Sequence, residues 1–180
     1  AEDKRMIRLI RSISNKPIYV DANQGWPTKE HALKMCQWLS EQGVVLIEQP
    51  MPKHMNEEHA WLCERVELPI IADEACQTYA DVAGLQPYYD GINIKLMKCG
   101  GVAEARKMIA LARELGMQVM IGCMTETSAG ISAAAMLSPL VDYADLDGHV
   151  LLANDPYEGI QLVNGKLTLV NKPGTGVTPL

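Results

Sequence analysis

The chain has 180 residues, 48% hydrophobic and 21% charged, a balance that suits one soluble globular domain with a sizeable core. Its formal net charge of -6, its sequence pI near 5.2 and the lack of a basic run argue against nucleic acid or an anionic membrane as a partner. The five scattered cysteines, with no Cys-x-x-Cys pair, and a charged N-terminal stretch unlike a secretion signal predict buried free thiols in a cytoplasmic protein.

Short aliphatic segments alternate with stretches of helical spacing along the chain. The first stretch is an apolar stripe that predicts a helix before any strand: Met6, Ile7, Ile10 and Ile13. The predicted strands are Ile18 to Val20, Val44 to Ile47, Pro69 to Ala72, Gly91 to Ile94, Met117 to Ile121 and Tyr143 to Leu146. Two of the intervening helices are predicted from the spacing of Ala32, Met35, Cys36 and Leu39, and of Val102, Ala105, Ile109 and Ala112.

This alternation predicts parallel strands joined by helices, in either an open sheet or a closed barrel. No glycine-rich phosphate-binding motif favours the open sheet. A full (β/α)8 barrel takes about 250 residues, so we predict a partial barrel over residues 1–155 that holds strands 3 to 8. Residues 156–180 contain two strand-like pieces around Asn164-Gly165, which predict a hairpin leaving the barrel.

Polar residues follow nearly every predicted strand, where a (β/α)8 barrel carries its chemistry. These residues are Asp21, Glu48, Asp73, Lys95, Glu126 and Asp145. The first three are acids about one strand-helix unit apart, so we expect their side chains to share one mouth. Three converging carboxylates repel one another unless a cation lies between them, and an oxygen-only ligand set suits Mg²⁺.

Lys95 ends the next apolar strand along the chain. A lone lysine is most often a solvated surface charge. Here the predicted position lies close to a divalent ion, and burial together with a nearby positive charge favours a neutral amine that can accept a proton. We therefore predict that Lys95 is an acid/base group.

Six ordered motifs spread over nearly the whole chain resemble the enolase superfamily. They are VDANQGW (20–26), LIEQP (46–50), IADE (71–74), INIKLMKCGG (92–101), IGCMTETSAGISAAA (121–135) and DLDG (145–148). The resemblance is closest to the muconate-lactonizing subgroup and, within it, to the dipeptide epimerases typified by L-Ala-D/L-Glu epimerase. It implies a (β/α)8 barrel and Mg²⁺-dependent removal of the proton α to a carboxylate, through a metal-stabilised enediolate.

The resemblance also implies roles for individual residues. Asp21, Glu48 and Asp73 correspond to the three metal ligands, and Lys95 to the acid/base on one face of the substrate carbon. Asp145 and Asp147 match an Asp-x-Asp pair that holds the substrate's α-ammonium group, although they could also be polar residues that merely end a strand. We expect Asp142, close by, to belong to a surface turn.

The loop after the fifth predicted strand supplies two further candidates. Cys123 and Glu126 lie where the family often lines its substrate pocket, although a free cysteine more often serves as a small buried hydrophobe. The spacing of the four histidines does not suit zinc. We expect His31, His54 and His59 at the surface, whereas His149 could approach the substrate.

The second acid/base of the family has no counterpart in these 180 residues. In this subgroup it is a lysine of a Lys-x-Lys motif on the second barrel strand, and neither that strand nor the capping domain that helps to select the substrate is present. The same subgroup contains o-succinylbenzoate synthases, cycloisomerases and N-acylamino acid racemases, which are alternative functions. An alternative of a different class is an incomplete barrel that only binds metal. Its open edge and apolar surface would favour a complementary N-terminal segment or self-association.

Overall fold

The computed structural model describes residues 2–180, which fold into two compact units. The first unit contains the residues up to Ala75 together with Leu85–Asp90, and the second contains Cys76–Gly84 and Gly91–Leu180. Each unit alternates parallel strands with helices, as the sequence predicts for part of a (β/α)8 barrel. Within residues 2–180, no helix has the length and apolar character needed to cross a membrane.

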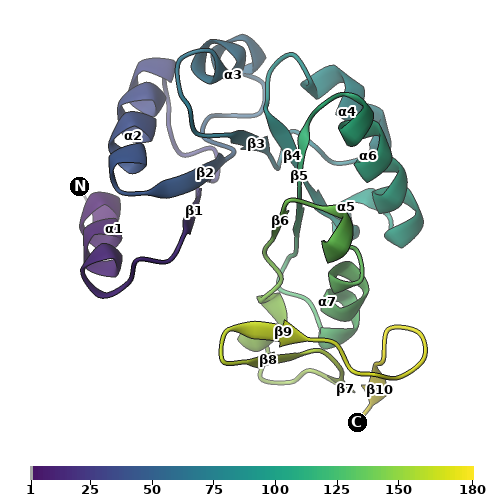
Figure 1. Ribbon diagram of the computed structural model, residues 1–180. Coiled ribbons are helices and arrows are strands. Elements are labelled where there is room, and N and C mark those ends of the chain that lie inside the picture. The colour runs from purple at the N-terminus through teal and green to yellow at the C-terminus, as the bar shows by residue number, and fades with distance from the viewer. Residues whose placement is uncertain (1) are drawn as a thin grey trace. The chain divides into compact units, whose positions relative to one another are not determined.

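The first unit holds three neighbouring parallel strands. Its elements are α1 (Glu2–Ile13), β1 (Ile18–Asp21), α2 (Lys29–Glu41), β2 (Val44–Glu48), α3 (Asn56–Cys63) and β3 (Ile70–Ala72). Strand β2 pairs with β1 on one side and with β3 on the other, and Asp21 lies directly opposite Glu48. Helices α2 and α3 lie on the same side of these strands (Figure 1), so the strand ends remain available for a site.

Helix α2 shows how the sequence sets an element's bounds. The Thr28 hydroxyl caps its N-terminus by accepting a hydrogen bond from the His31 N–H. The predicted stripe is buried: Ala32, Met35, Cys36 and Leu39. Gly43 then adopts a φ of +72°, a conformation that glycine reaches without strain, and the chain turns directly into β2.

Helix α1 forms as predicted, but its apolar stripe is not a core face. Ile7 is buried at 6% exposure, whereas Ile13 is 80% exposed. Cations attach the helix to α2 instead, because Lys4 Nζ lies 4.7 Å and the Arg8 guanidinium 5.5 Å from the centre of the Trp38 ring. Cation–π contacts of this kind explain why the helix docks without burying all of its apolar residues.

The second unit holds the other three parallel strands. Its elements are β4 (Gly91–Lys95), α5 (Leu96–Cys99), α6 (Val102–Glu114), β5 (Gln118–Gly122), α7 (Ser128–Ala135) and β6 (Tyr143–Ala144). It also contains all of α4 (Tyr79–Leu85) except the last residue, which belongs to the first unit. Strand β5 pairs with β4 and with β6, and Lys95 lies directly opposite Gly122. Strand β6 (Tyr143–Ala144) is shorter than the predicted Tyr143 to Leu146, and a short 3₁₀ helix (Gly148–Leu151) begins four residues after its end.

The C-terminal residues form the predicted hairpin. Strands β8 (Gln161–Val163) and β9 (Lys166–Thr168) pair in antiparallel fashion. The intervening Asn164 and Gly165 have φ values of 51° and 75°, as a two-residue type I′ turn requires. A second antiparallel pair joins β7 (Tyr157–Glu158) to β10 (Thr178–Pro179). The proposed domain boundary between residues 155 and 156 stays a prediction.

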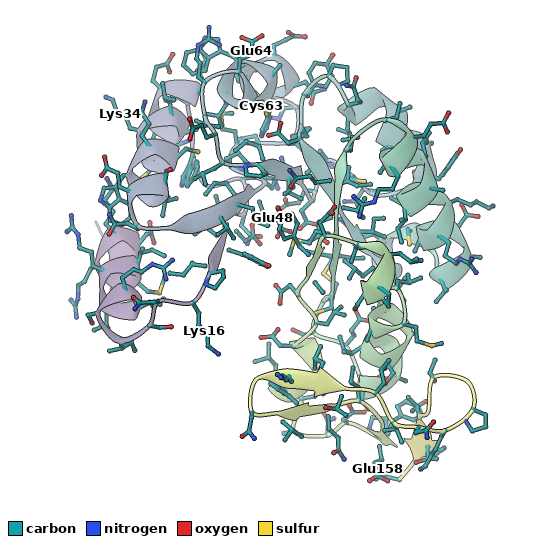
Figure 2. All side chains as sticks on the ribbon, viewed as in Figure 1. Lys16, Lys34, Glu48, Cys63, Glu64 and Glu158 are labelled. Carbon is teal, nitrogen blue, oxygen red and sulfur yellow. The ribbon has the colours of Figure 1, made fainter. Side chains whose placement is uncertain are left out.

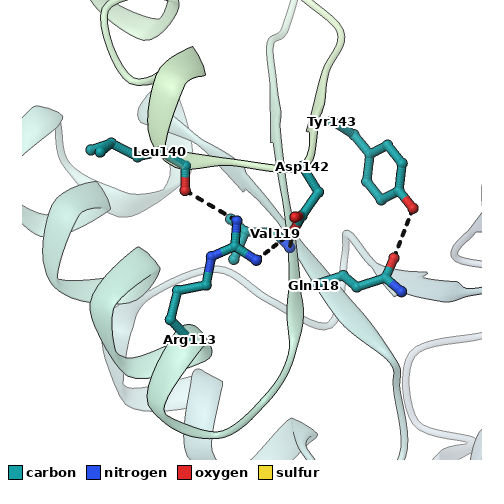
Figure 3. A network of polar contacts seen from close by, with 6 residues as sticks. All are labelled: Arg113, Gln118, Val119, Leu140, Asp142 and Tyr143. Carbon is teal, nitrogen blue, oxygen red and sulfur yellow. Dashed lines mark hydrogen bonds and ion pairs between the residues drawn. The ribbon is translucent and has the colours of Figure 1, made fainter.

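Asp142 ties the end of α6 to the start of β5 in the second unit. Its Oδ2 accepts hydrogen bonds from Arg113 Nη1 at 2.6 Å and from the Val119 N–H at 2.8 Å, and Arg113 Nη2 donates to the Leu140 carbonyl (Figure 3). Partial burial opposes ionisation of Asp142, but the guanidinium and the amide outweigh it and hold the pKa of the carboxyl below its ordinary value. This turn residue is therefore also a link between elements.

We expect Asp142→Asn to lower the free energy of unfolding by about 1 kcal/mol at neutral pH, because the half-exposed ion pair is screened by solvent. The pKa of Asp142 is lowered in the folded state from its ordinary value of 3.8, so the carboxylate stabilises the fold above that pH. This contribution is lost as the pH falls through the lower folded-state pKa. Urea denaturation of both proteins at about pH 7 and about pH 3 measures the difference. An equal difference at both pH values would contradict the assignment.

Candidate active site

The three predicted acids come together in the first unit. One carboxylate oxygen from each of Asp21, Glu48 and Asp73 lies within 4.8 Å of the other two. Asp21 and Glu48 are register partners at the ends of β1 and β2, and Asp73 directly follows β3. Figure 2 shows Glu48 at the end of β2, on the inner side of the strands, while Lys34 and Glu64 point outward from the helical layer.

This carboxylate cluster fits a divalent cation. Glu48 is 5% exposed and Asp73 6% exposed, so water screens little of the repulsion between their charges. Asp21 is exposed, which leaves one side of the cluster open to solvent or to a substrate. Oxygen ligands of this kind, in a site with room for other ligands, suit Mg²⁺.

A tight turn holds the Asp21 side chain in place. Asp21 Oδ1 accepts a hydrogen bond from the Asn23 N–H at 2.8 Å, and Oδ2 accepts one from Asn23 Nδ2 at 2.7 Å. Asn23 and Gln24 have φ values of 44° and 61°, in the left-handed region that asparagine tolerates better than most residues. The residues after β1 in the VDANQGW motif thus orient the only exposed acid of the carboxylate cluster.

Lys95 and the Asp-x-Asp pair lie in the second unit. Lys95 is the last residue of β4 and is half-buried. Asp145 is exposed, but the protein atoms around its carboxyl partly desolvate it and raise its pKa above the ordinary value; the charge of Asp147 adds to this effect, whereas the nearby Lys95 opposes it. Lys95 and Asp147 are therefore each close enough to influence Asp145 electrostatically.

Asp145 and Asp147 follow the end of β6 and flank a buried residue. The Asp145 N–H donates to the Ile121 carbonyl at 2.9 Å, so the chain still follows β5 at this point. Leu146 is buried at 3% exposure, and the aspartates on either side of it are exposed. Both aspartates are therefore accessible, and the charge of Asp147 acts on Asp145, so the pair is suited to holding one cationic group.

Cys123 and Glu126 lie in the loop between β5 and α7, not on a strand. Glu126 Oε1 accepts a hydrogen bond from the Met124 N–H at 3.0 Å. Burial raises the pKa of the Cys123 thiol, and the charges of Asp145, Glu126 and Asp147 raise it further, against the opposing Gly148 amide. Cys123 is thus a protonated thiol within a group of carboxylates.

Glycines allow this loop to approach the Asp-x-Asp turn. A Cβ at Gly148 would lie 2.1 Å from the Met124 carbonyl oxygen and 3.1 Å from Cys123 Sγ. A Cβ at Gly130 would lie 2.2 Å from Glu126 Oε2. The structure therefore brings the four predicted substrate-binding residues into one region of the second unit, although their contact with a substrate stays a prediction.

The predicted surface position of one histidine is wrong. His31 and His54 are exposed as expected, but His59 is completely buried on α3. Its Nδ1 lies 2.7 Å from the Met55 carbonyl oxygen and 3.2 Å from Tyr89 Oη. Nothing in the local sequence identifies this partner, because Tyr89 is 30 residues away.

The strand-helix repeat and the acids at its strand ends define the class of protein. The chain belongs to the enolase C-terminal domain-like family, whose family model matches residues 1–180. This confirms the fold class predicted from the sequence, a partial (β/α)8 barrel.

Individual relatives narrow the similarity to dipeptide epimerases of the enolase superfamily. The chain is 56% identical over 175 residues to L-Ala-D/L-Glu epimerase of Bacteroides thetaiotaomicron, an alignment that covers 97% of this chain and 46% of the relative. Among solved structures, it superimposes with a TM-score of 0.90 and 36% identity on a dipeptide epimerase from Enterococcus faecalis complexed with Mg and the dipeptide L-Leu-L-Tyr, covering 98% of this chain and 52% of that one. The match to the substrate-liganded L-Ala-D/L-Glu epimerase of Bacillus subtilis has a TM-score of 0.90 and 32% identity, again covering 98% and 52%. The chain therefore spans about half the length of these relatives.

Proposed function

We propose that this chain is the barrel portion of a Mg²⁺-dependent dipeptide epimerase of the L-Ala-D/L-Glu type. The observation that carries the proposal is the carboxylate cluster, in which Asp21, Glu48 and Asp73 bring their oxygens within 4.8 Å of one another at the ends of consecutive strands. The 56% identity to an L-Ala-D/L-Glu epimerase supports the choice of reaction. The five free thiols also support a cytoplasmic location.

In this proposal Asp21, Glu48 and Asp73 hold the metal. A bound Mg²⁺ supplies Lewis-acid stabilisation of the negative charge that develops on the substrate carboxylate. Glu48 and Asp73 are almost buried, so the protein holds them in place before the ion binds. The exposed Asp21 faces the open side, from which substrate would enter.

Lys95 transfers the proton in this proposal. Its neutral amine accepts the α-proton of the residue that carries the free carboxylate, so the Cα–H bond breaks and its electron pair moves toward the carboxylate. In the other direction, the Lys95 ammonium returns a proton to the same face of the carbon. Epimerisation also needs an acid/base group on the opposite face, and we assign no residue of this chain to that role.

Asp145 and Asp147 select the substrate class. Two neighbouring, exposed carboxylates suit the α-ammonium group of a dipeptide, and the positive charge of the ligand would relieve their mutual repulsion. Cys123 and Glu126 would line the same pocket. A dipeptide is therefore a better substrate for this chain than the ammonium-free substrates of an o-succinylbenzoate synthase, a cycloisomerase or an N-acylamino acid racemase.

Deuterium uptake tests the proposed reaction directly. The intact protein is incubated with Mg²⁺ and a dipeptide library in deuterated water, and mass spectrometry detects the gain of mass at the α-carbon. We expect uptake by L-Ala-L-Glu or by related dipeptides, together with inversion of the second residue. Metal binding without uptake by any dipeptide would contradict the epimerase and support a barrel that only binds metal.

Asp147→Asn distinguishes the epimerase from its relatives in the subgroup. We expect kcat/KM for a dipeptide to fall roughly a hundredfold, because the substrate ammonium loses one of two charged partners. An N-acetylated dipeptide has no ammonium group, so its slow turnover should change little. Steady-state kinetics with both substrates measures the contrast. Unchanged kcat/KM for the dipeptide would defeat the epimerase assignment.

A further inference from the structure

Gln49 occupies an unusual position beside the carboxylate cluster. It directly follows Glu48 at the end of β2 and is completely buried. Its φ is +33°, on the side of the Ramachandran plot that residues other than glycine rarely adopt. Such a backbone conformation costs about 1 kcal/mol or more, so the surrounding contacts must hold the residue in place.

The side-chain amide of Gln49 uses its full hydrogen-bonding capacity. Oε1 accepts from the Asp73 N–H at 3.0 Å and from the Ala75 N–H at 3.1 Å. Nε2 donates to the Met51 carbonyl at 3.1 Å and to Tyr89 Oη at 3.0 Å. Two acceptor sites and two donors are all that a glutamine side chain has, so this network admits one orientation of the amide.

The backbone of Gln49 contacts the remaining strands of the cluster. Its N–H donates to the Ile71 carbonyl in β3 at 2.9 Å, and its carbonyl accepts from the Gln24 N–H at 2.8 Å, in the turn after β1. Gln49 therefore bonds to the segments that carry Asp21 and Asp73 and is covalently joined to Glu48. Every acid of the cluster is connected to this single residue.

Tyr89 contacts the Gln49 amide, and His59 packs against Tyr89. Tyr89 is 4% exposed and His59 is fully buried, and their ring centres are 4.6 Å apart. The Met55 carbonyl can only accept a hydrogen bond, so the nearby Nδ1 of His59 carries a proton. Burial lowers the pKa of His59, against the effect of that carbonyl, and keeps the ring neutral. Tyr89 and the neutral His59 thus form an uncharged, packed support for the Gln49 amide.

We propose that Gln49 is the positioning residue of the metal centre, since its buried amide and strained backbone hold the segments bearing Asp21, Glu48 and Asp73 at the spacing that a divalent ion requires. The inference rests on the proposed function, because it presumes that the carboxylate cluster binds metal. Residues that orient metal ligands without touching the ion typically contribute about 10- to 100-fold to metal affinity.

Mn²⁺ binding to the intact protein tests this role without relying on activity. Calorimetry gives the Kd of Mn²⁺, and electron paramagnetic resonance reports the symmetry of the bound ion. We expect Gln49→Met, which keeps the length of the side chain but lacks the amide, to raise the Kd about 10- to 100-fold and to broaden the Mn²⁺ spectrum. The control is Ser132→Ala, which removes another completely buried hydrogen bond, the one that the Ser132 hydroxyl accepts from the Ile160 N–H at 3.1 Å. This variant should lose stability and keep the Kd of the unmodified protein.

The possible outcomes separate this inference from the proposed function. No Mn²⁺ binding by the unmodified protein would defeat the metal centre itself, and the role of Gln49 with it. Tight binding by the unmodified protein, with the same Kd and spectrum in Gln49→Met, would overturn the role of Gln49 alone. If Gln49→Met does not fold, Tyr89→Phe removes the hydroxyl that contacts Gln49 Nε2 and His59 Nδ1 but leaves the other three hydrogen bonds of the Gln49 amide, and we expect a loss of several-fold in affinity. An unchanged Kd in that variant would equally overturn the inference.

Discussion

Lys95→Met is expected to abolish epimerisation in both directions, with kcat reduced about 10⁴-fold or more. Methionine keeps the length of the apolar stem but cannot accept or return a proton. The acid/base on the opposite face is untouched by the change. The substrate epimer whose α-hydrogen faces that second group should therefore still exchange hydrogen with deuterated water, although it no longer inverts. Chiral chromatography measures inversion, and mass spectrometry measures exchange.

The matched control for this variant is Lys107→Met. Lys107 is an exposed lysine on α6 that pairs with Glu104 at 2.7 Å, a surface ion pair of little energetic value. Its replacement should leave inversion, exchange and Mg²⁺ affinity unchanged. Lys95→Met should likewise keep its Mg²⁺ affinity, because Lys95 is not a proposed metal ligand. Inversion at the unmodified rate in Lys95→Met would remove Lys95 from the mechanism.

The acids at the strand ends could be predicted from the sequence because they follow from local rules. Parallel strands that alternate with helices place their carboxyl ends on one side, so acids directly after successive strands must lie close together. Asp21 and Glu48 even turn out to be register partners. Lys95 was located by the same rule, as the last residue of β4. Its catalytic role, inferred from its place beside the expected metal ion and from the family resemblance, stays a prediction.

The supporting residues could not be predicted because their partners are distant in the sequence. Gln49 lies within a recognised motif, yet its role depends on Tyr89, 40 residues further on, and on the backbone of Asp73. His59 was expected at the surface as one of three histidines in helix-like or connecting segments, whereas tertiary packing against Tyr89 buries it. Helix periodicity also predicted more buried residues in α1 than the structure has. Two cationic side chains of α1 lie over the Trp38 ring there in place of apolar contacts.

Glu48→Gln is expected to change metal affinity and metal-free stability in opposite directions. Glutamine has the same shape but no charge, so the Mg²⁺ site loses one of its three carboxylates, and we expect the Kd to rise about 100-fold or more with a comparable loss of activity. Without metal, the same change removes a buried charge that two neighbouring carboxylates repel across less than 4.8 Å. We therefore expect the metal-free variant to be more stable than the unmodified protein by about 1 kcal/mol.

Calorimetric titration with Mg²⁺ and urea denaturation in the presence of a chelator measure the two effects. Glu64→Gln is the control, because Glu64 has a side chain that is 71% exposed and pairs only with the neighbouring Arg65 among the ion pairs described here. Glu64→Gln should change neither the Mg²⁺ affinity nor the stability of the metal-free protein. The opposite signs matter because general damage to the fold would weaken metal binding and stability together. Loss of a charge that the other two carboxylates repel should instead weaken Mg²⁺ binding and raise the stability of the metal-free protein. A metal-free Glu48→Gln protein that is less stable than the unmodified one would mean that other contacts of Glu48 outweigh the repulsion within the carboxylate cluster.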